Sequence, residues 1–185
     1  MSETLSLEDY RRVALETASY ESIDGISFLY PAVGIIGELG EVSDVIKKLW
    51  RDSGGVLDHS WRYKLVMELG DALWFVVALE REFGVQASWC SEPDGKHTNP
   101  LLTVLQINQV AGHLSGCVRE ICLGAPDSRN MLKQKHTNEI GSCLNIIFYC
   151  LTKLALFIEV PLEEIFAANI QKLQYRRAGG QQKYR

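Results

Sequence analysis

The feature that most constrains the fold of this chain is the spacing of its apolar residues. Apolar side chains recur every three or four positions along nearly the whole sequence, which is the pattern of helices with one buried face. Strand pairs with a hairpin turn are not expected. The spacing predicts helices over residues 6–22, 31–51, 60–84, 101–123, 131–159 and 161–177. The expected fold class is therefore all-α, a helical bundle of about six helices.

Local signals mark several helix ends. Ser6 is a candidate N-cap, with Asp9 three residues later in a weaker form of the capping box. The run from Asp52 to Gly55 ends the second helix, and Pro161 suits the first turn of the last one. The turn residues between 88 and 100 predict a loop. Residues 1–178 are expected to form a single domain, and residues 179–185 a flexible tail.

The sequence contains a candidate internal repeat. Residues 68–79 align without gaps with residues 139–150, sharing Glu, Gly and Leu at matching places. Residues 37–46 align more loosely with residues 112–121. The helix pair at 31–84 and a degenerate second helix pair at 101–159 would then surround a four-helix core. Chance similarity between amphipathic helices is the alternative.

Composition limits the classes of function. The net charge of −4 argues against a general nucleic-acid partner. The N-terminal residues lack the basic start and apolar stretch of a signal peptide, and no uninterrupted apolar run reaches a membrane-spanning length, so a cytoplasmic protein without membrane contact is expected. The 5 cysteines include no CxxC pair, and the 4 histidines show no metal-binding spacing. Buried, reduced thiols are expected rather than disulfides or a zinc site.

Four carboxylates stand out on two consecutive predicted helices. Glu38 and Glu41 are three residues apart, as are Glu68 and Asp71, so each pair shares a helix face. Glu38 falls within the apolar stripe of its helix, and Glu68 at the edge of another. Ionised carboxylates on buried faces need a partner. Oxygen ligands without His or Cys favour Mg²⁺, with Mn²⁺ as a substitute. The alternative is solvated acids paired with lysines.

These residues resemble a known family. The run GIIGELGEVSDVIKKLW, followed by ELGDALWF, is similar to the MazG-like all-α NTP pyrophosphohydrolases, a superfamily related to the dimeric dUTPases. The family signature is ExxE on one helix and ExxD on the next. The resemblance extends to LEEIFAANIQKLQYRR near the C-terminus, and spans residues 10–85 and 160–177. Residues 90–135 depart from the short family pattern.

The resemblance implies a function. It implies a Mg²⁺-dependent hydrolase that cleaves a (d)NTP to the monophosphate and pyrophosphate. A homodimer is also expected, through apolar surface that the bundle leaves uncovered. Glu38, Glu41, Glu68 and Asp71 would bind the metal, with Glu41 and Glu38 as catalytic residues and Glu41 as the general base. The corresponding Lys and Arg of the family's last helix contact phosphates.

The resemblance therefore implies that Lys172 and Arg176 bind substrate phosphates, and that Lys64 has a similar role. Lysine and arginine side chains extending to solvent at a helix edge are the alternative reading. Trp50, Trp74 and Asn145 are weaker candidates for contacts to the base, and core packing is the alternative for each. Two other functions stay open, a narrow dUTPase- or dCTPase-like enzyme and a catalytically weak nucleotide-binding regulatory module.

Overall fold

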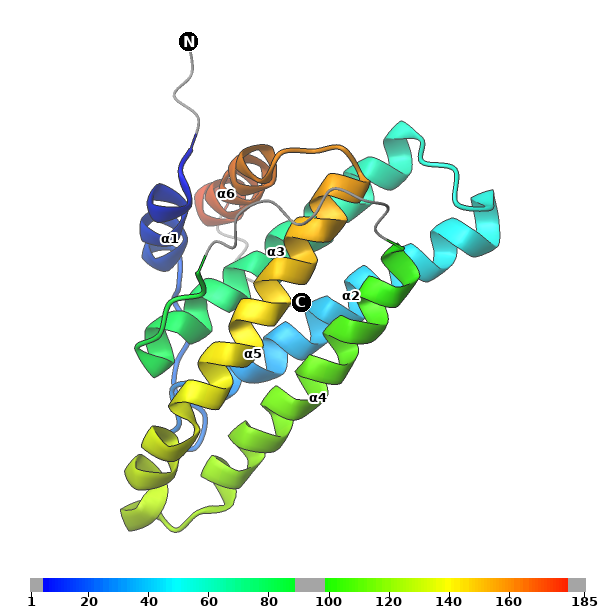
Figure 1. Cartoon of the computed structure of the whole chain (residues 1–185). Helices are drawn as coiled ribbons and strands as arrows, with labels where there is room; N and C mark the ends of the chain where they lie inside the picture. The colour runs from blue at the N-terminus through cyan, green and yellow to red at the C-terminus, as the bar shows by residue number, and fades with distance from the viewer. Residues whose placement is uncertain (1–4, 89–98, 180–185) are drawn as a thin grey trace.

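The computed structural model describes residues 5–88 and 99–179, and it confirms the all-α fold (Figure 1). A short 3-10 turn, Pro126–Ser128, precedes the fifth helix. Most of the loop predicted at 88–100 lies outside the described residues. The helices are α1 Leu7–Glu16, α2 Leu29–Ser53, α3 His59–Phe83, α4 Pro100–Leu123, α5 Arg129–Phe157 and α6 Leu162–Ala178.

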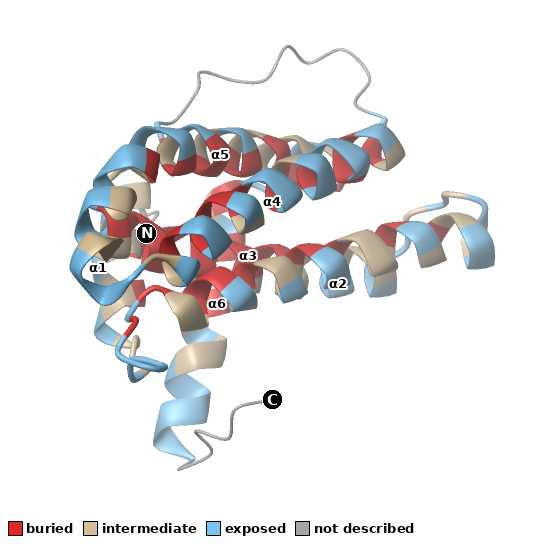
Figure 2. Ribbon diagram, turned by 90° about the horizontal axis from the view of Figure 1, so that it is seen from below, coloured by how far each residue is buried: buried red, intermediate tan, exposed pale blue. Residues whose placement is uncertain are grey.

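Helices α2 to α5 form the body of the bundle. The pair α2–α3 packs against the pair α4–α5, with α2 lying on α4 and α3 on α5. The buried residues of these helices face one another in the interior (Figure 2). Helices α1 and α6 contact each other, and both lie against α3. This arrangement is the one that a duplicated helix pair would produce, although common origin of the two pairs stays a prediction.

The first helix is shorter than predicted. Ser6 caps it as expected, accepting a hydrogen bond from the Asp9 amide at 3.1 Å. The helix ends at Glu16 rather than at residue 22. Thr17 follows as the C-cap, and its hydroxyl donates to the Ala14 carbonyl at 2.6 Å. The Thr17 side chain thus binds a carbonyl at the C-terminal end of the helix. Such side-chain hydrogen bonds compete with continued helical hydrogen bonding, and hydrophobic periodicity does not reveal them.

A tight turn follows in the connection to α2. Asp24 and Gly25 both have positive φ, 51° and 73°, and an isolated antiparallel bridge joins Ile23 to Ile26. Asp-Gly is a preferred pair for such a turn, because both central residues take left-handed conformations. Within the described residues this turn closes a single bridge and no strand, which agrees with the expectation that strand pairs are absent, although the Asp-Gly turn itself was not predicted.

Two helical glycines bring other elements close to α3. A Cβ at Gly34 would lie 2.2 Å from Cε1 of Phe75, so α2 approaches α3 more closely than a side chain permits. A Cβ at Gly70 would lie 2.9 Å from Cβ of Asn169, so the same holds for α6. Both approaches draw neighbouring helices toward the region of α3 that carries Glu68.

A buried ion pair fixes α1 on α3. The Arg11 guanidinium donates from Nε to Glu80 Oε2 at 2.9 Å, and its Nη2 donates to the Ala87 carbonyl at 2.7 Å. Glu80 also accepts from the Ala87 amide at 2.6 Å, so most of the polar atoms of this contact are paired. Removing one partner would leave a buried charge unpaired, which costs about 3–5 kcal/mol.

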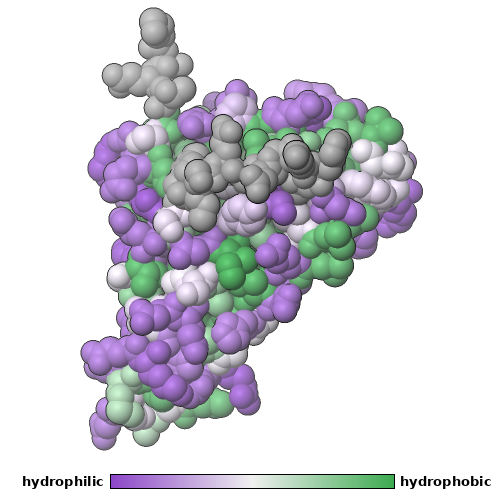
Figure 3. All heavy atoms as spheres, in the orientation of Figure 1, coloured by the Kyte–Doolittle hydropathy of each residue, from purple (hydrophilic) through white to green (hydrophobic). Residues whose placement is uncertain are grey.

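Helix α5 is long and apolar enough to cross a membrane by length and composition, with a mean hydropathy of 1.7 over its most apolar window. Half of that window is buried inside the bundle, and the core helix of a globular protein gives the same signal. Hydrophilic residues cover much of the molecule near the α4–α5 connection in the view of Figure 3. The apolar surface of α5 is thus explained in large part by packing.

Candidate metal centre

Three of the four predicted carboxylates converge between α2 and α3. Glu38 and Glu41 of α2 and Glu68 of α3 each offer an oxygen, and these oxygens lie within 4.8 Å of one another. Glu38 and Glu68 are partly buried, whereas Glu41 is exposed at the outer side of the group. The i,i+3 spacing places both α2 acids on the face toward α3, so the helix geometry accounts for the convergence. Glu38, Glu41 and Glu68 are called the carboxylate cluster below.

The cluster is electrostatically strained without a cation. Burial is the main cause that raises the pKa of Glu38 to about 7, and the charges of Asp71, Glu41 and Glu68 add to it. Burial also raises the pKa of Glu68, with further contributions from Glu41 and Asp71. Like charges this close cannot all ionise cheaply, so the site must bind either protons or a positive ion.

Asp71 stands beside the cluster with both its oxygens turned to α6. Its Oδ1 accepts from Nδ2 of Asn169 at 3.0 Å, and its Oδ2 forms an ion pair with the Lys172 ammonium. The Asp71 charge nevertheless raises the pKa values of Glu38 and Glu68, so it acts on the same site. The predicted fourth ligand is therefore a close neighbour of the cluster, with each of its oxygens already in contact with α6.

A buried hydrogen-bond chain leads from α1 to Asp71. The Tyr10 hydroxyl donates to Oδ1 of Asn169 at 3.0 Å, and the Tyr10 ring stacks on Phe166 with centroids 4.4 Å apart. Asn169 is 2% exposed. Burial, followed by the Asp71 charge, raises the Tyr10 pKa well above its usual range, so the hydroxyl remains a donor. The chain fixes the amide of Asn169 so that its nitrogen faces Asp71.

Neither Asn169 nor Tyr10 was predicted to belong to the site. An Asn within the apolar stripe of α6 was a usable signal, because a buried amide needs polar partners. Tyr10 gave no signal, since its partners lie 60 and 159 residues away.

The predicted phosphate-binding cations differ in position. Lys172 lies at the site through its ion pair with Asp71. Lys64 is exposed, with Nζ 4.3 Å from the centroid of the Trp61 ring. Arg176 is exposed in the last turn of α6, one turn beyond Lys172. The structure thus brings Lys172 to a predicted ligand, and the roles of Lys64 and Arg176 stay predictions.

The weaker base-binding candidates make packing contacts. Trp50 stacks on Phe157 with centroids 6.0 Å apart. Trp74 donates from Nε1 to Oγ1 of Thr17 at 3.0 Å, which ties α3 to the end of α1. Asn145 accepts from the Ser88 amide at 2.6 Å. These contacts favour the alternative stated for all three, a structural role.

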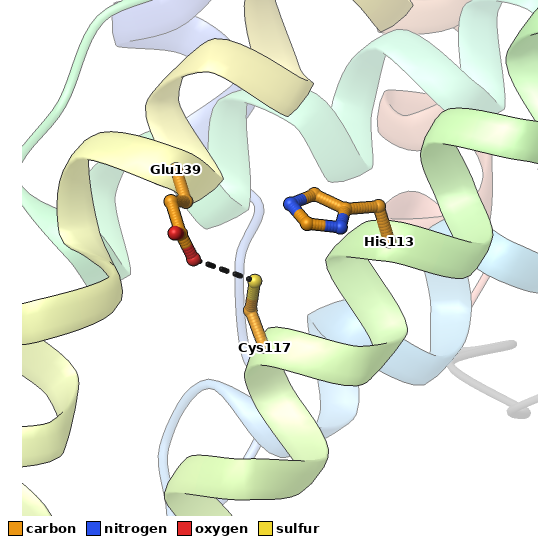
Figure 4. A group of neighbouring side chains, drawn as sticks. All are labelled: His113, Cys117 and Glu139. Carbon is orange, nitrogen blue, oxygen red and sulfur yellow. Dashed lines mark hydrogen bonds between the residues drawn. The ribbon is translucent and has the colours of Figure 1, made fainter.

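A second group of metal-ligating side chains lies between α4 and α5. His113, Cys117 and Glu139 offer atoms that all lie within 4.8 Å of one another (Figure 4). Neither the histidines alone nor the cysteines alone show a metal-binding spacing. The i,i+4 pair of His113 and Cys117 was the available signal, and the fold adds Glu139 from the next helix.

Comparison with known proteins places the chain in a family. No protein-family description matches it, and no solved structure does. Over 103 residues the chain is 34% identical to the Gene 37 protein of Mycobacterium phage L5, a match covering 52% of this chain and 86% of the phage protein. The chain belongs to the family of this phage protein. The name of that relative states no activity, so function has to be argued from the site.

Proposed function

We propose that this protein is a Mg²⁺-dependent nucleoside triphosphate pyrophosphohydrolase, which cleaves a (d)NTP to the monophosphate and pyrophosphate. One observation carries the proposal, the convergence of three carboxylates from two adjacent helices within 4.8 Å. The similarity of ExxE and ExxD to the MazG-like signature supplies the reaction class. A cluster of acids alone would fit many roles, and the nearby ammonium of Lys172 adds a group suited to phosphate.

The residues present fit a magnesium ion. Glu38, Glu41 and Glu68 would hold it through oxygen atoms, which hard cations prefer. The raised pKa values of Glu38 and Glu68 indicate the charge that a cation would neutralise. A bound Mg²⁺ neutralises phosphate charge and lowers the pKa of a coordinated water. Mn²⁺ has the same preference for oxygen ligands and is the expected substitute.

The chain's own residues have separate tasks in this proposal. Glu41 is the exposed member of the cluster and the proposed general base, since a carboxylate that is not fully used as a ligand can accept a proton from water. Glu38 shares the metal and is the second catalytic residue. Lys172 binds a phosphate oxygen, and in doing so releases Asp71 from its ion pair to complete the ligand set. Asn169 keeps Asp71 in place during that exchange.

The experiment that tests the proposal is product analysis over a panel of nucleotides. Purified protein with Mg²⁺ is incubated with each common NTP and dNTP, and the monophosphate, pyrophosphate and phosphate are quantified. We expect the monophosphate and pyrophosphate in equal amounts, and Glu68→Gln as a control should abolish both. Activity confined to dUTP or dCTP would favour the narrow enzyme. Nucleotide binding without any product would favour the regulatory module and contradict the proposal.

A further inference from the structure

The second helix pair carries a ligand set of a different chemical kind. His113 and Cys117 lie one turn apart on α4 and point toward Glu139 of α5 (Figure 4). Sγ of Cys117 lies 3.4 Å from Oε2 of Glu139, and the ligand atoms of all three residues lie within 4.8 Å of one another. Imidazole nitrogen, thiolate sulfur and carboxylate oxygen together are typical of zinc rather than of magnesium.

We propose that His113, Cys117 and Glu139 form a zinc-binding site that joins α4 to α5. The inference is independent of the proposed hydrolase, because it uses none of the residues of the carboxylate cluster. Three protein ligands leave a fourth position for water in tetrahedral zinc.

The distances suit a zinc ion after a small movement. Zinc–ligand distances of about 2.0–2.3 Å in a tetrahedron place neighbouring ligand atoms roughly 3.4–3.6 Å apart. The sulfur–oxygen distance of 3.4 Å already agrees with that range. The remaining pairs, at no more than 4.8 Å, need to close by at most about 1.4 Å, which side-chain rotation supplies.

Neighbouring groups orient the carboxylate ligand. Buried His136 lies with Nδ1 2.9 Å from Oε2 of Glu139 and with Nε2 3.1 Å from Oε2 of Glu120. The contact with His136 holds the Glu139 carboxylate beside Cys117, whose thiol donates to the same oxygen. Hydrogen-bond partners outside the ligands commonly fix metal-binding side chains in this way.

Access and proton balance are consistent with binding. His113 and Glu139 are exposed and Cys117 is 4% exposed, so an ion can enter from solvent and reach a thiol at the inner end of the site. On binding, the S–H bond breaks, a sulfur–zinc bond forms, and one proton leaves to solvent.

The proposed zinc site also has a counterpart in the first helix pair. In the repeat alignment His113 takes the place of Glu38, and Glu139 the place of Glu68. If the repeat is real, one copy would keep oxygen ligands for magnesium and the other would have acquired nitrogen and sulfur ligands. The second pair would then keep only Glu139 of the four acidic positions, too few carboxylates to hold a catalytic Mg²⁺.

The test is a titration of the metal-free full chain with Co²⁺, which serves as a visible substitute for Zn²⁺. A phosphine reductant keeps the thiols reduced, and no nucleotide is present. Cobalt bound to a thiolate gives an intense near-ultraviolet charge-transfer band. We expect the band to saturate at one cobalt per chain and Zn²⁺ to displace it. Cys117→Ser should remove the band, and His113→Ala should weaken cobalt affinity at least about 10-fold.

Matched controls separate this site from others. Cys122→Ser, a partly buried cysteine outside the group, and Glu68→Gln in the carboxylate cluster should both keep the band. His113 is exposed, so His113→Ala tests the site even if Cys117→Ser disturbs the fold, which circular dichroism reports. Absence of the thiolate band, its persistence in Cys117→Ser, or unchanged affinity in His113→Ala would overturn the proposal, leaving the group as a thiol–carboxylate hydrogen bond.

Discussion

Glu38 is the residue where burial and like charge act together. Its place inside the apolar stripe of α2 follows from the sequence, because a position on a helix fixes its angle about the axis. Its surroundings follow from the fold, since Asp71 and Glu68 reach it from α3. The functional prediction for Glu38 therefore rested on pattern, whereas its raised pKa required the packed structure.

The metal-free protein should lose stability as the pH rises through about 7. The Glu38 pKa is about 7 in the folded chain against an ordinary value of 4.5. The folded state thus binds this proton more tightly than the unfolded chain does. The contribution of this proton to the free energy of unfolding is fully present below about pH 4.5 and is lost as the pH rises through the folded pKa. Urea unfolding midpoints are measured with a chelator present at about pH 5.5 and at about pH 8.5. From the lower pH to the higher, the midpoint should fall in the wild type and fall less in Glu38→Gln. Identical pH dependence in both proteins would contradict the assignment.

At the level of single side chains, the four acids and Lys172 were predicted to belong to the site. The orientation of Asp71 toward α6 was not predicted. The ExxD spacing places Asp71 on the correct face of α3, but spacing carries no information about a partner on α6. The hydrogen bond from Asn169 and the ion pair with Lys172 join residues 98 and 101 positions apart. Tyr10 was missed for the same reason.

The approach of α6 to α3 depends on Gly70. A Cβ there would lie 2.9 Å from Cβ of Asn169, so Gly70→Ala must push α6 outward or move Asn169. Overpacking of this kind costs about 1–3 kcal/mol. We expect lower stability in chemical unfolding together with reduced turnover at saturating Mg²⁺, because Asp71 and Lys172 separate.

Gly112→Ala is the matched control for Gly70→Ala. A Cβ at Gly112 meets no atom within 4 Å, and the residue lies in α4. Replacing an exposed helical Gly by Ala stabilises by about 0.5–1 kcal/mol. Equal stability and equal turnover in Gly70→Ala and wild type would show that the close approach of α6 is unimportant.

The two helix pairs should differ in their contribution to catalysis. Glu68 and Glu139 occupy matching places in the repeat alignment, but Glu139 has His113 and Ser142 where Glu68 has Glu38 and Asp71. Glu68→Gln should therefore be severe, with a loss of at least about 100-fold, while Glu139→Gln should be mild. Turnover numbers at saturating Mg²⁺ and nucleotide decide this, and equal losses would show that the second pair has been misassigned.

Helix positions were predicted closely, and the errors have local causes. Helix α2 ends at Ser53 before Gly54 in a left-handed conformation, as the glycine pair indicated. Helix α1 ends early at Glu16, where the Thr17 hydroxyl donates to the Ala14 carbonyl, and Asp24 and Gly25 later turn the chain. Hydrophobic spacing continues through such a connection when its apolar residues pack on the core, so periodicity overestimates helix length there.

The whole bundle brings the site together from elements distant in sequence. Helices α2 and α3 supply the carboxylate cluster, α6 supplies Lys172 and Asn169, and α1 supports α6 through Tyr10 (Figure 1). The number and type of helices could be predicted because each is amphipathic. The packing of α1 and α6 on α3 could not, because it depends on close contacts between particular side chains.

Magnesium should stabilise the folded protein as a whole. A metal that binds the folded site and hardly the unfolded chain adds about 1.4 kcal/mol at roughly ten times its dissociation constant. For a chain of this size the melting temperature should rise by about 3–6 °C. Ca²⁺ should also bind but support turnover poorly, because its coordination is larger and looser. A melting temperature indifferent to millimolar Mg²⁺, with and without nucleotide, would count against the site.

The central claim is that the carboxylates act as one magnesium site for nucleotide cleavage. Its most direct test is the rate of Mg²⁺-dependent pyrophosphate release by the wild type, Glu38→Gln and Asp71→Asn, with the fold checked by circular dichroism. The wild type should turn over, and each variant should lose at least about 100-fold in rate. Glu38→Gln should remain folded, since removing one negative charge relieves repulsion in the metal-free site. Asp71→Asn also removes the ion-pair partner of Lys172, so its rate is compared only on protein that circular dichroism shows to be folded. Full activity in either folded variant would contradict the claim.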